Sequence, residues 1–471
     1  MSDTPCLVVD LDRTLLMGDS LHEQLIQGFF SNPLLLFMCF FSLLRGRAAF
    51  KKAVATNFAI DANTVPIREP FLTWLREKRA HGSELHLCTA AHQSIAGSIA
   101  DRLGLFDSVI GSIDINLKGQ SKADHLVRMF PGGFVYAGDS HADLAVWKQS
   151  QGIVLVGTTA SVERAARELG KPIEASFPAE RFCIRDWLRA IRIHHWAKNA
   201  LIFIPLLLGH DWNNLRGIVT TLLGFPILLL LVSSTYLIND LADLSSDRAH
   251  WSKCHRPIAS GRISVFTAFC VGIGGIITAL LLGFFVAVPF GIALSSYLAI
   301  TLAYSFGLKQ VPLLDIFIIA FLFTLRVIMG TVLAGQHYSE WLLAFSMVFF
   351  FSLAAAKRHT ELLRTLAKGG VAARGYRAED TIVTAIFGIA TGVSSTLILA
   401  LYFTEDSFQS ATYHRPAALW IMPLLVSILI GRIWLLAQRG EMRDDPVSFV
   451  LRDRSMLGLG LVGAAAFLLA L

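Results

Sequence analysis

From residue 195 onward the chain is a succession of apolar segments, and this feature constrains its fold more than any other. Crossing the hydrocarbon core of a bilayer takes about 20 mostly apolar residues, and several of these segments approach that length. The sequence therefore predicts an all-α membrane bundle of about nine transmembrane helices. The predicted spans are 198–210, 217–238, 263–285, 289–306, 313–334, 341–356, 381–403, 416–436 and 456–471.

Charge divides the chain into two parts. Charged residues make up 16% of the sequence, against about 25% in an average soluble domain. Residues 1–190 hold 20 basic and 20 acidic residues, so the net charge of +6 belongs entirely to the membrane part. No basic patch stands apart from the membrane flanks, which argues against a nucleic-acid partner. We expect a globular domain over 1–170, a polar linker over 171–190 and the membrane domain over 191–471.

The basic residues also predict an orientation. Fifteen lysines and arginines lie in one set of loops, whereas the opposite set holds only Arg216 and Arg415. By the positive-inside rule the first set faces the cytoplasm of a bacterial inner membrane. No apolar leader precedes the first strand, so we expect the N-terminal domain on the same side, and six scattered cysteines predict reduced thiols. The basic loops are 239–262, 307–312, 357–380 and 437–455.

Three short apolar runs in the first domain each end at a polar residue. Residues 6–9 end at Asp10, residues 85–88 at Thr89, and residues 134–137 at Gly138 and Asp139. Such strands, separated by helical stretches, predict a Rossmann-like α/β domain with a parallel sheet, whose function lies at the carboxyl ends of the strands.

A long insertion with helical periodicity, about 15–84, separates the first two strands and predicts a helical cap. Its apolar run Phe29–Leu44 is short and interrupted by proline. We favour a buried cap helix for this run over a helix that rests on the membrane.

Polar residues that suit phosphoryl transfer follow these strands in order. Asp10 and Asp12 stand two residues apart, so that one carboxylate can attack phosphorus and the other can exchange protons. A hydroxyl and an ammonium group suit the transferring phosphoryl group, and further carboxylates suit Mg²⁺. These later positions are Thr89, Lys122, Asp139 and Asp143.

This set resembles the haloacid dehalogenase superfamily of phosphatases over residues 1 to about 170. The resemblance implies that Asp10 is the nucleophile and Asp12 the general acid/base. It implies that Thr89 and Lys122 steady the phosphoryl group. Mg²⁺ would be held by Asp10, Asp139 and the Asp12 carbonyl, with Asp143 in support.

A second acidic cluster lies at the cytoplasmic end of the second predicted span. Asp240, Asp243 and Asp247 have the spacing i, i+3, i+7, which places three carboxylates on one helical face, with Asn239 alongside. Like charges at a membrane boundary are costly unless neutralised, and Mg²⁺ bound to a diphosphate would neutralise them. Basic residues suited to anions follow, namely Lys253, His255, Arg256 and Arg262.

This arrangement resembles the UbiA superfamily of intramembrane transferases over roughly residues 190–471. The stretches 193–199 (IHHWAKN), 256–262 (RPIASGR) and 304–309 (YSFGLK) support the resemblance, as does Asp315. Prenyltransferases of this superfamily carry a second Asp-rich motif, but the matching loop here, 357–377, is basic. One acidic cluster and one basic loop suit a donor with a diphosphate and a further phosphate, such as phosphoribosyl diphosphate.

The pattern is similar to the decaprenyl-phosphate phosphoribosyltransferase branch, in which a polyprenyl phosphate attacks C1 of the ribose. That resemblance implies that Asp240, Asp243 and Asp247 hold Mg²⁺-diphosphate beside Asn239. Phosphates would be bound by Lys198, Lys309, Lys357 and Arg358, and Arg256 and Arg262 would add anion contacts. Tyr304 and Glu361 belong to the same motifs.

Arg326 lies in the middle of a predicted span, where a charge is expensive. Asp315 lies eleven residues earlier on the same helix face, about 16 Å away along the axis. We expect both to line the cavity and not to pair with each other.

Three functions stay open. The leading one is a bifunctional enzyme that makes polyprenyl-phosphoryl-5-phosphoribose and then removes the 5-phosphate. The second is a prenyltransferase that acts on an aromatic or other acceptor, fused to a phosphatase of unrelated substrate. The third is a lipid-binding scaffold whose sites have decayed; two intact motif sets oppose it.

Overall fold

The computed structural model describes residues 6–113, 116–179, 183–209, 214–367, 375–407, 413–442, 449 and 453–471. The chain forms two compact units. Unit 1 combines Met1–Ile191 with Tyr236–Ile273, and unit 2 combines Arg192–Thr235 with Gly274–Leu471. The predicted domain limits stay predictions, but the acidic segment near residue 240 falls in the same unit as the N-terminal domain.

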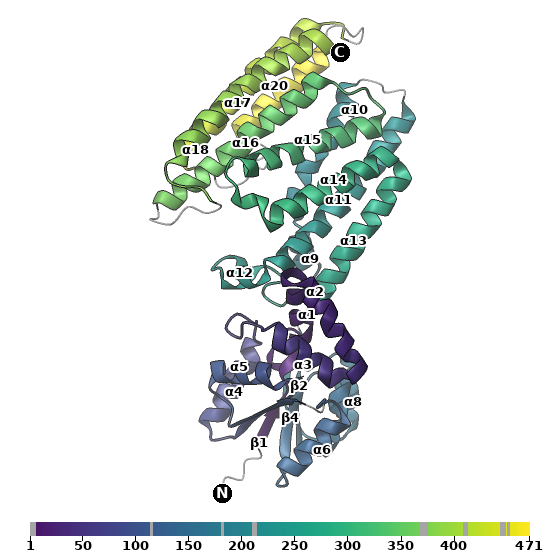
Figure 1. The fold of residues 1–471 in the computed structure, drawn as a ribbon, viewed down its shortest axis with the longest axis vertical. Coiled ribbons are helices and arrows are strands. Elements are labelled where there is room, and N and C mark those ends of the chain that lie inside the picture. Colours follow the sequence, from purple (N-terminus) through teal and green to yellow (C-terminus); the bar gives the residue numbers. More distant parts are fainter. Residues whose placement is uncertain are drawn as a thin grey trace. The chain divides into compact units, whose positions relative to one another are not determined.

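Unit 1 contains a six-stranded sheet in which every neighbouring pair is parallel (Figure 1). The strand order is β3-β2-β1-β4-β5-β6, so the chain reverses direction across the sheet between β1 and β4. This confirms the predicted α/β fold with a parallel sheet. The strands are β1 Cys6–Val9, β2 Leu85–His92, β3 Ser108–Ser112, β4 Phe134–Gly138, β5 Gly152–Val156 and β6 Ile173–Phe177.

Helices cover both faces of this sheet. Leu7 and Val9 of β1 belong to one core with α4 and α5, whereas Val8 belongs to the other core with α6, α7 and α8. Successive side chains of a strand point to opposite faces, so β1 is buried on both. The helices of the N-terminal part are α1 Ser20–Ser31, α2 Pro33–Phe40, α3 Arg47–Asn57, α4 Glu69–Ala80, α5 Gln93–Leu103, α6 Gln120–Met129, α7 Leu144–Gln149, α8 Ala160–Glu168 and α9 Ile184–Ala190.

Two segments differ from the sequence-based interpretation. The stretch 171–190, interpreted as a polar linker, contributes β6 to the sheet and also contains α9. The apolar run Phe29–Leu44 is helical as expected but is not a buried cap helix. Leu36 and Cys39 are buried in the cap core and Leu35 packs against it, whereas most of the other side chains of the run are exposed. The run is apolar on every side, and one neighbouring helix can cover only one side.

Seven helices among the described residues are long and apolar enough to cross a membrane, not the nine expected. The predicted span 198–210 is divided between a 3₁₀ helix, Ile193–Phe203, and the five-residue α10 with Pro205 near its start. The predicted span 456–471 is the 17-residue α20, which at 1.5 Å per residue falls short of the ~30 Å hydrocarbon core.

The remaining helices form the membrane part. Their bounds are α10 Ile204–Leu208, α11 Leu215–Ala242, α12 Leu244–Ala249, α13 Val265–Val286, α14 Val288–Phe306, α15 Leu314–Ala334, α16 Glu340–Ala367, α17 Asp380–Tyr402, α18 Ile421–Gln438 and α20 Arg454–Ala470. The chain is thus a multi-pass membrane protein with seven candidate spans. The predicted loop 357–380 is wrong at its start, because α16 continues to Ala367 with Arg358 and Leu362 buried. Lys368 and Arg374 of the basic set lie outside the described residues.

Candidate active sites

The sheet brings the first predicted set of residues together at its carboxyl edge. Asp10 follows β1 and is 8% exposed, and its backbone N–H donates to Ala137 O of β4 at 3.0 Å. Thr89 lies within β2 and is fully buried. Asp139 follows β4 directly. Because β2, β1 and β4 are neighbours, residues from three distant parts of the chain meet at one edge.

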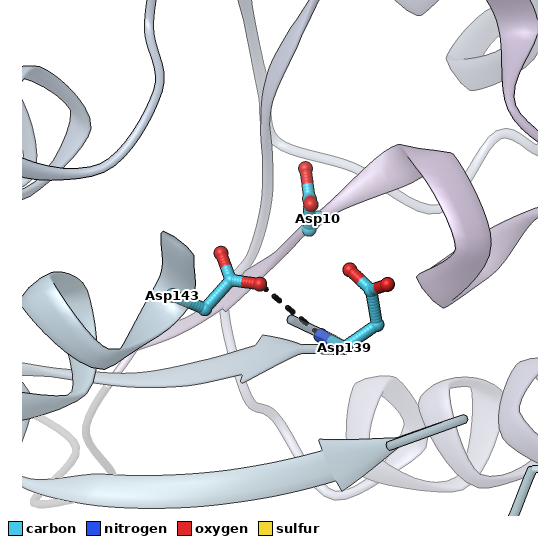
Figure 2. A group of neighbouring side chains, drawn as sticks. All are labelled: Asp10, Asp139 and Asp143. Carbon is cyan, nitrogen blue, oxygen red and sulfur yellow. Dashed lines mark hydrogen bonds between the residues drawn. The ribbon is translucent and has the colours of Figure 1, made fainter. Parts of the chain in front are cut away.

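Three carboxylates cluster there. Oxygen atoms of Asp10, Asp139 and Asp143 all lie within 4.8 Å of one another, which suits a metal ion (Figure 2). The backbone N–H groups of Asp139 and Ser140 donate to Asp143 Oδ2 at 3.2 and 3.0 Å and fix its position. Hard oxygen ligands of this kind are what Mg²⁺ prefers. The donor set therefore fits Mg²⁺.

One lysine partly balances this negative charge. Lys122 of α6 is 3% exposed, and its Nζ donates to Asp10 Oδ1 at 2.9 Å and to the Tyr136 hydroxyl at 2.8 Å. Tyr136 in turn donates to Asp143 Oδ1 at 3.0 Å. Burial lowers the pKa of Lys122, but Asp10 and Asp143 outweigh that effect, so the pKa is raised and the ammonium stays charged.

Three carboxyl groups at this edge, those of Asp10, Asp12 and Asp139, have a raised pKa. Burial, together with the charges of Asp10 and Asp143, raises the pKa of Asp139 to about 8. Burial and the nearby Asp19 raise the pKa of Asp12 to about 7. Burial also raises the pKa of Asp10, although Lys122 opposes the shift. A divalent cation would offset the repulsion between these carboxylates, and it would have to displace their protons to bind.

Asp12 lies beside this cluster in a tight turn. Its Oδ1 accepts a hydrogen bond from the Ser20 backbone N–H at 2.8 Å, at the start of cap helix α1. Asp12 lines the same cavity of about 260 Å³ as Asp10, Thr89, Lys122 and Asp139. The cavity holds the complete predicted set, so all six residues are near one another.

The sequence did not single out Lys51, which the cap contributes to this cavity from α3. Its Nζ donates to Ala90 O at 2.6 Å and to Asn116 Oδ1 at 3.1 Å. Burial lowers its pKa, although Asp12 and Asp19 oppose the shift. Tyr136 was also missed, because a tyrosine inside an apolar strand has the pattern of an ordinary core residue.

The second acidic cluster also lies in unit 1, but not on one continuous helix. α11 ends at Ala242 and α12 begins at Leu244, so the helix is interrupted at Asp243, although the Asp243 N–H still donates to Asn239 O at 2.9 Å and the Asp247 N–H to Asp243 O at 2.8 Å. Asp240 and Asp247 still meet, because Arg256 Nη1 donates to Asp240 Oδ1 at 3.1 Å and to Asp247 Oδ2 at 2.5 Å. Both carboxylates are buried.

Two side-chain oxygen atoms of this cluster accept no hydrogen bond from the described residues. Asp247 Oδ1 and Asn239 Oδ1 are buried and have no hydrogen-bond partner among the described residues. Lys253 Nζ lies 3.6 Å from that Asp247 oxygen, which is a charge contact rather than a hydrogen bond. Unsatisfied buried oxygens are costly, and a divalent cation would satisfy them. Arg262 does not join the cluster, because its Nη1 lies 3.1 Å from Asp186 Oδ1.

In unit 2 Asp315 and Arg326 have different partners and do not pair with each other, as the sequence predicted. Asp315 is fully buried; it accepts from Arg358 Nε at 2.8 Å and from the Tyr376 hydroxyl at 2.6 Å. Arg358 also bonds Glu361. Buried acids and bases that pair in this way keep charge inside the helical bundle at a tolerable cost.

Arg326 has polar partners and no carboxylate among them. Its Nε donates to Asn199 Oδ1 at 2.8 Å and its Nη2 to the Tyr297 hydroxyl at 2.9 Å. A further set of predicted residues is half-buried in unit 2 on helices or a 3₁₀ turn. These are Lys198, Tyr304, Lys309 and Lys357.

The model of one family matches the membrane part of the chain, over residues 200–457, and is described as the UbiA prenyltransferase family. The chain belongs to the UbiA prenyltransferase family. This confirms the family resemblance drawn from the Asp-rich segment, although the phosphatase resemblance of the N-terminal domain stays a prediction.

Three UbiA-family relatives show how much of the chain is shared. Protein y4nM of Sinorhizobium fredii is 44% identical over 99% of this chain and 91% of its own. The nodulation protein NoeC of Azorhizobium caulinodans is 31% identical over 63% of this chain and 95% of its own. The decaprenyl-phosphate phosphoribosyltransferase of Mycolicibacterium smegmatis is 28% identical over 59% of this chain and 92% of its own.

A solved UbiA homologue from Archaeoglobus fulgidus, bound to GPP and Mg²⁺, is 14% identical. It covers 60% of this chain and 98% of its own, with a TM-score of 0.43.

Proposed function

We propose that this UbiA-family protein is a bifunctional membrane enzyme. Its membrane domain transfers 5-phosphoribose from phosphoribosyl diphosphate to a polyprenyl phosphate, and its N-terminal domain removes the 5-phosphate to leave polyprenyl-phosphoryl-ribose. The observation that carries the proposal is the pairing, on one chain, of a phosphatase-like cluster with a domain related to decaprenyl-phosphate phosphoribosyltransferase. The first reaction would produce the phosphate monoester that the second consumes.

In the transfer reaction, Asp240, Asp243 and Asp247 would hold Mg²⁺, which neutralises the diphosphate as it leaves. The free buried oxygens of Asp247 and Asn239 support this role. Arg256, which donates to Asp240 and Asp247, would supply positive charge for the diphosphate.

A phosphate oxygen of the polyprenyl phosphate attacks C1 of the ribose, and the bond from C1 to the diphosphate oxygen breaks. Further phosphate contacts would come from Lys198, Lys309 and Lys357. Arg262 and Arg358 would add contacts only by leaving their partners Asp186 and Asp315. Tyr304, Asp315, Arg326 and Glu361 would shape the cavity.

In the hydrolysis reaction, Asp10 attacks the 5-phosphate and Asp12 gives its proton to the departing ribose oxygen. Water then attacks phosphorus while Asp12 takes its proton, which frees inorganic phosphate and restores Asp10. Mg²⁺ held by Asp10, Asp139 and the Asp12 carbonyl, with Asp143 in support, would screen the phosphate charge. Lys122 and Thr89 would hold the phosphoryl oxygens.

We propose that both reactions take place at the cytoplasmic face of a bacterial inner membrane, because the basic loops predict that orientation. Phosphoribosyl diphosphate would reach the site from the cytoplasm, and the polyprenyl phosphate from the lipid.

The donor can be tested directly. Purified full-length protein is incubated with Mg²⁺, a polyprenyl phosphate and labelled phosphoribosyl diphosphate, and the lipid extract is counted. We expect labelled lipid from wild type and a weaker apparent affinity for the donor from Lys357→Glu, since a charge-assisted phosphate contact is worth about 1.5–3 kcal/mol. Lys148→Glu, in α7, is the matched control. Turnover of a prenyl diphosphate with an aromatic acceptor, and none of the sugar donor, would establish the alternative function.

A further inference from the structure

One face of the cap is strongly apolar and exposed. Five side chains of α2 and the following 3₁₀ turn, Phe41–Arg45, are each at least 60% exposed, and we name them the cap apolar face. They are Leu34, Phe37, Met38, Phe41 and Leu44. Soluble proteins rarely leave such a contiguous patch in water.

The segment is nevertheless well formed. Asn32 caps α2, its Oδ1 accepting from the Leu35 backbone N–H at 3.0 Å. Leu36 and Cys39 pack beneath the face in one core with Phe50 and Val54 of α3. The cap therefore holds the apolar face outward on a fixed helix, and the exposure is a feature of the fold.

The charged residues in the sequence around this face are all basic. From residue 24 to residue 60 the sequence contains no aspartate or glutamate, whereas it contains Arg45, Arg47, Lys51 and Lys52. Arg45, Arg47 and Lys52 are exposed. Apolar side chains beside basic ones match the boundary between acyl chains and anionic headgroups of a bilayer.

The cap also contacts a helix that itself enters the membrane. Within unit 1, His22 of α1 stacks on Phe266 at 4.7 Å between ring centroids, and Phe29 meets Phe269 edge-on at 5.1 Å. Phe266 and Phe269 lie in the first turns of α13, a candidate membrane span. The helix that carries the cap apolar face, α2, follows α1 directly in the chain, and α1 contacts a candidate membrane span.

We propose that the cap apolar face inserts into the lipid–water interface of the membrane that the chain spans. The active-site cavity is lined by Ser20 and Gln24 of α1 and by Lys51 of α3, on the same cap. Anchoring would keep this cavity at the bilayer surface, and so select phosphate monoesters carried on lipids over soluble ones. This last step rests on the proposed phosphatase function, whereas the insertion does not.

Insertion is tested on the full-length protein in lipid nanodiscs. A fluorophore is attached to single cysteines at position 34 or 44 in a background without native cysteines, with position 129 of α6 as the matched exposed control. Lipids brominated along the acyl chain should quench at positions 34 and 44 and leave position 129 unchanged. The absence of quenching at positions 34 and 44 would overturn the proposal. Self-quenching between labelled copies would also overturn it, because it would show that the face binds a second copy of the chain.

The preference for lipid-borne over soluble phosphate monoesters is tested with the triple variant Leu34→Glu/Phe37→Glu/Leu44→Glu. The double variant Val127→Glu/Met129→Glu, on α6, is the control. Hydrolysis of a lipid-borne phosphate monoester in bilayers should fall by about tenfold, because the cap no longer holds the cavity against the bilayer surface. Hydrolysis of soluble p-nitrophenyl phosphate should be unchanged. Equal loss on both substrates, or none on the lipid, would overturn the selectivity. If wild type hydrolyses neither substrate while quenching persists, the phosphatase proposal fails and the insertion stands.

Discussion

Replacing Arg248 by methionine should destabilise unit 1 strongly, because it leaves a carboxylate buried without its cation. Arg248 Nη1 and Nη2 each donate to one oxygen of Glu23 at 2.8 Å, and both side chains are 6% exposed. Arg248 Nε also donates to Ala259 O at 3.1 Å. Glu23 lies on cap helix α1, and Arg248 directly follows Asp247 of the second acidic cluster, so this pair joins the two functional segments.

The expected size follows from the burial. Removing one partner of a buried, hydrogen-bonded ion pair costs about 3–5 kcal/mol, so Arg248→Met and Glu23→Gln should each lower the free energy of unfolding by that amount. The double variant Glu23→Leu/Arg248→Met removes both charges and should recover most of the loss. The control pair is Glu163–Arg167 of α8, at 37% and 61% exposed, where Arg167→Met should cost no more than about 0.5 kcal/mol.

Thiol labelling of Cys88, which is fully buried beside β1, measures the opening of the sheet in the full-length protein. The other five cysteines are replaced, and the labelling rate is followed against urea concentration. If Arg248→Met costs no more than Arg167→Met, or if the double variant loses the sum of the two single losses, the pair is not the buried contact described here.

Three further outcomes are expected. Lys122→Met should slow phosphate-ester hydrolysis about 10²–10³-fold and leave lipid labelling intact, because the cation beside Asp10 is lost; equal loss of both activities would contradict this. Asp240→Asn should abolish Mg²⁺-dependent lipid labelling while hydrolysis of p-nitrophenyl phosphate continues, and normal labelling would exclude Asp240 from the transfer site. Because the raised pKa of Asp139, about 8, keeps a proton on that carboxyl at lower pH when no cation is bound, Mg²⁺ should displace a proton at pH 6.5 and bind more tightly as the pH rises to 8. Calorimetry in two buffers of different ionisation enthalpy measures the release, and a pH-independent affinity would contradict it.

The sequence was a good guide to the first site because strand ends are local features. Asp10, Thr89 and Asp139 each end or follow a short apolar run, and parallel strands bring their carboxyl ends to one edge. Lys51 could not be predicted in the same way. It comes from a cap helix, and only the fold of the cap brings it to the cavity.

The errors arose where hydropathy and spacing alone were used. Asp243 has the spacing of a helical face, but the helix is interrupted at that residue. Lys357 and Arg358 look like loop residues by composition, yet α16 continues because Arg358 finds Asp315 as a buried partner. Apolar composition suggested burial for Phe37 and Leu44, although composition alone cannot separate a buried helix from one exposed to lipid.

The most direct test of the bifunctional account is the mass of the lipid product. Wild type, Asp10→Asn and Asp240→Asn are each incubated with phosphoribosyl diphosphate, a polyprenyl phosphate and Mg²⁺, and the extracts are analysed by mass spectrometry. We expect polyprenyl-phosphoryl-ribose from wild type and unmodified polyprenyl phosphate from Asp240→Asn. Asp10→Asn should give the ribosylated lipid with one additional phosphate, because a carboxamide is a poor nucleophile. If wild type and Asp10→Asn give the same phosphorylated lipid, the two domains do not act in sequence and the central claim is wrong.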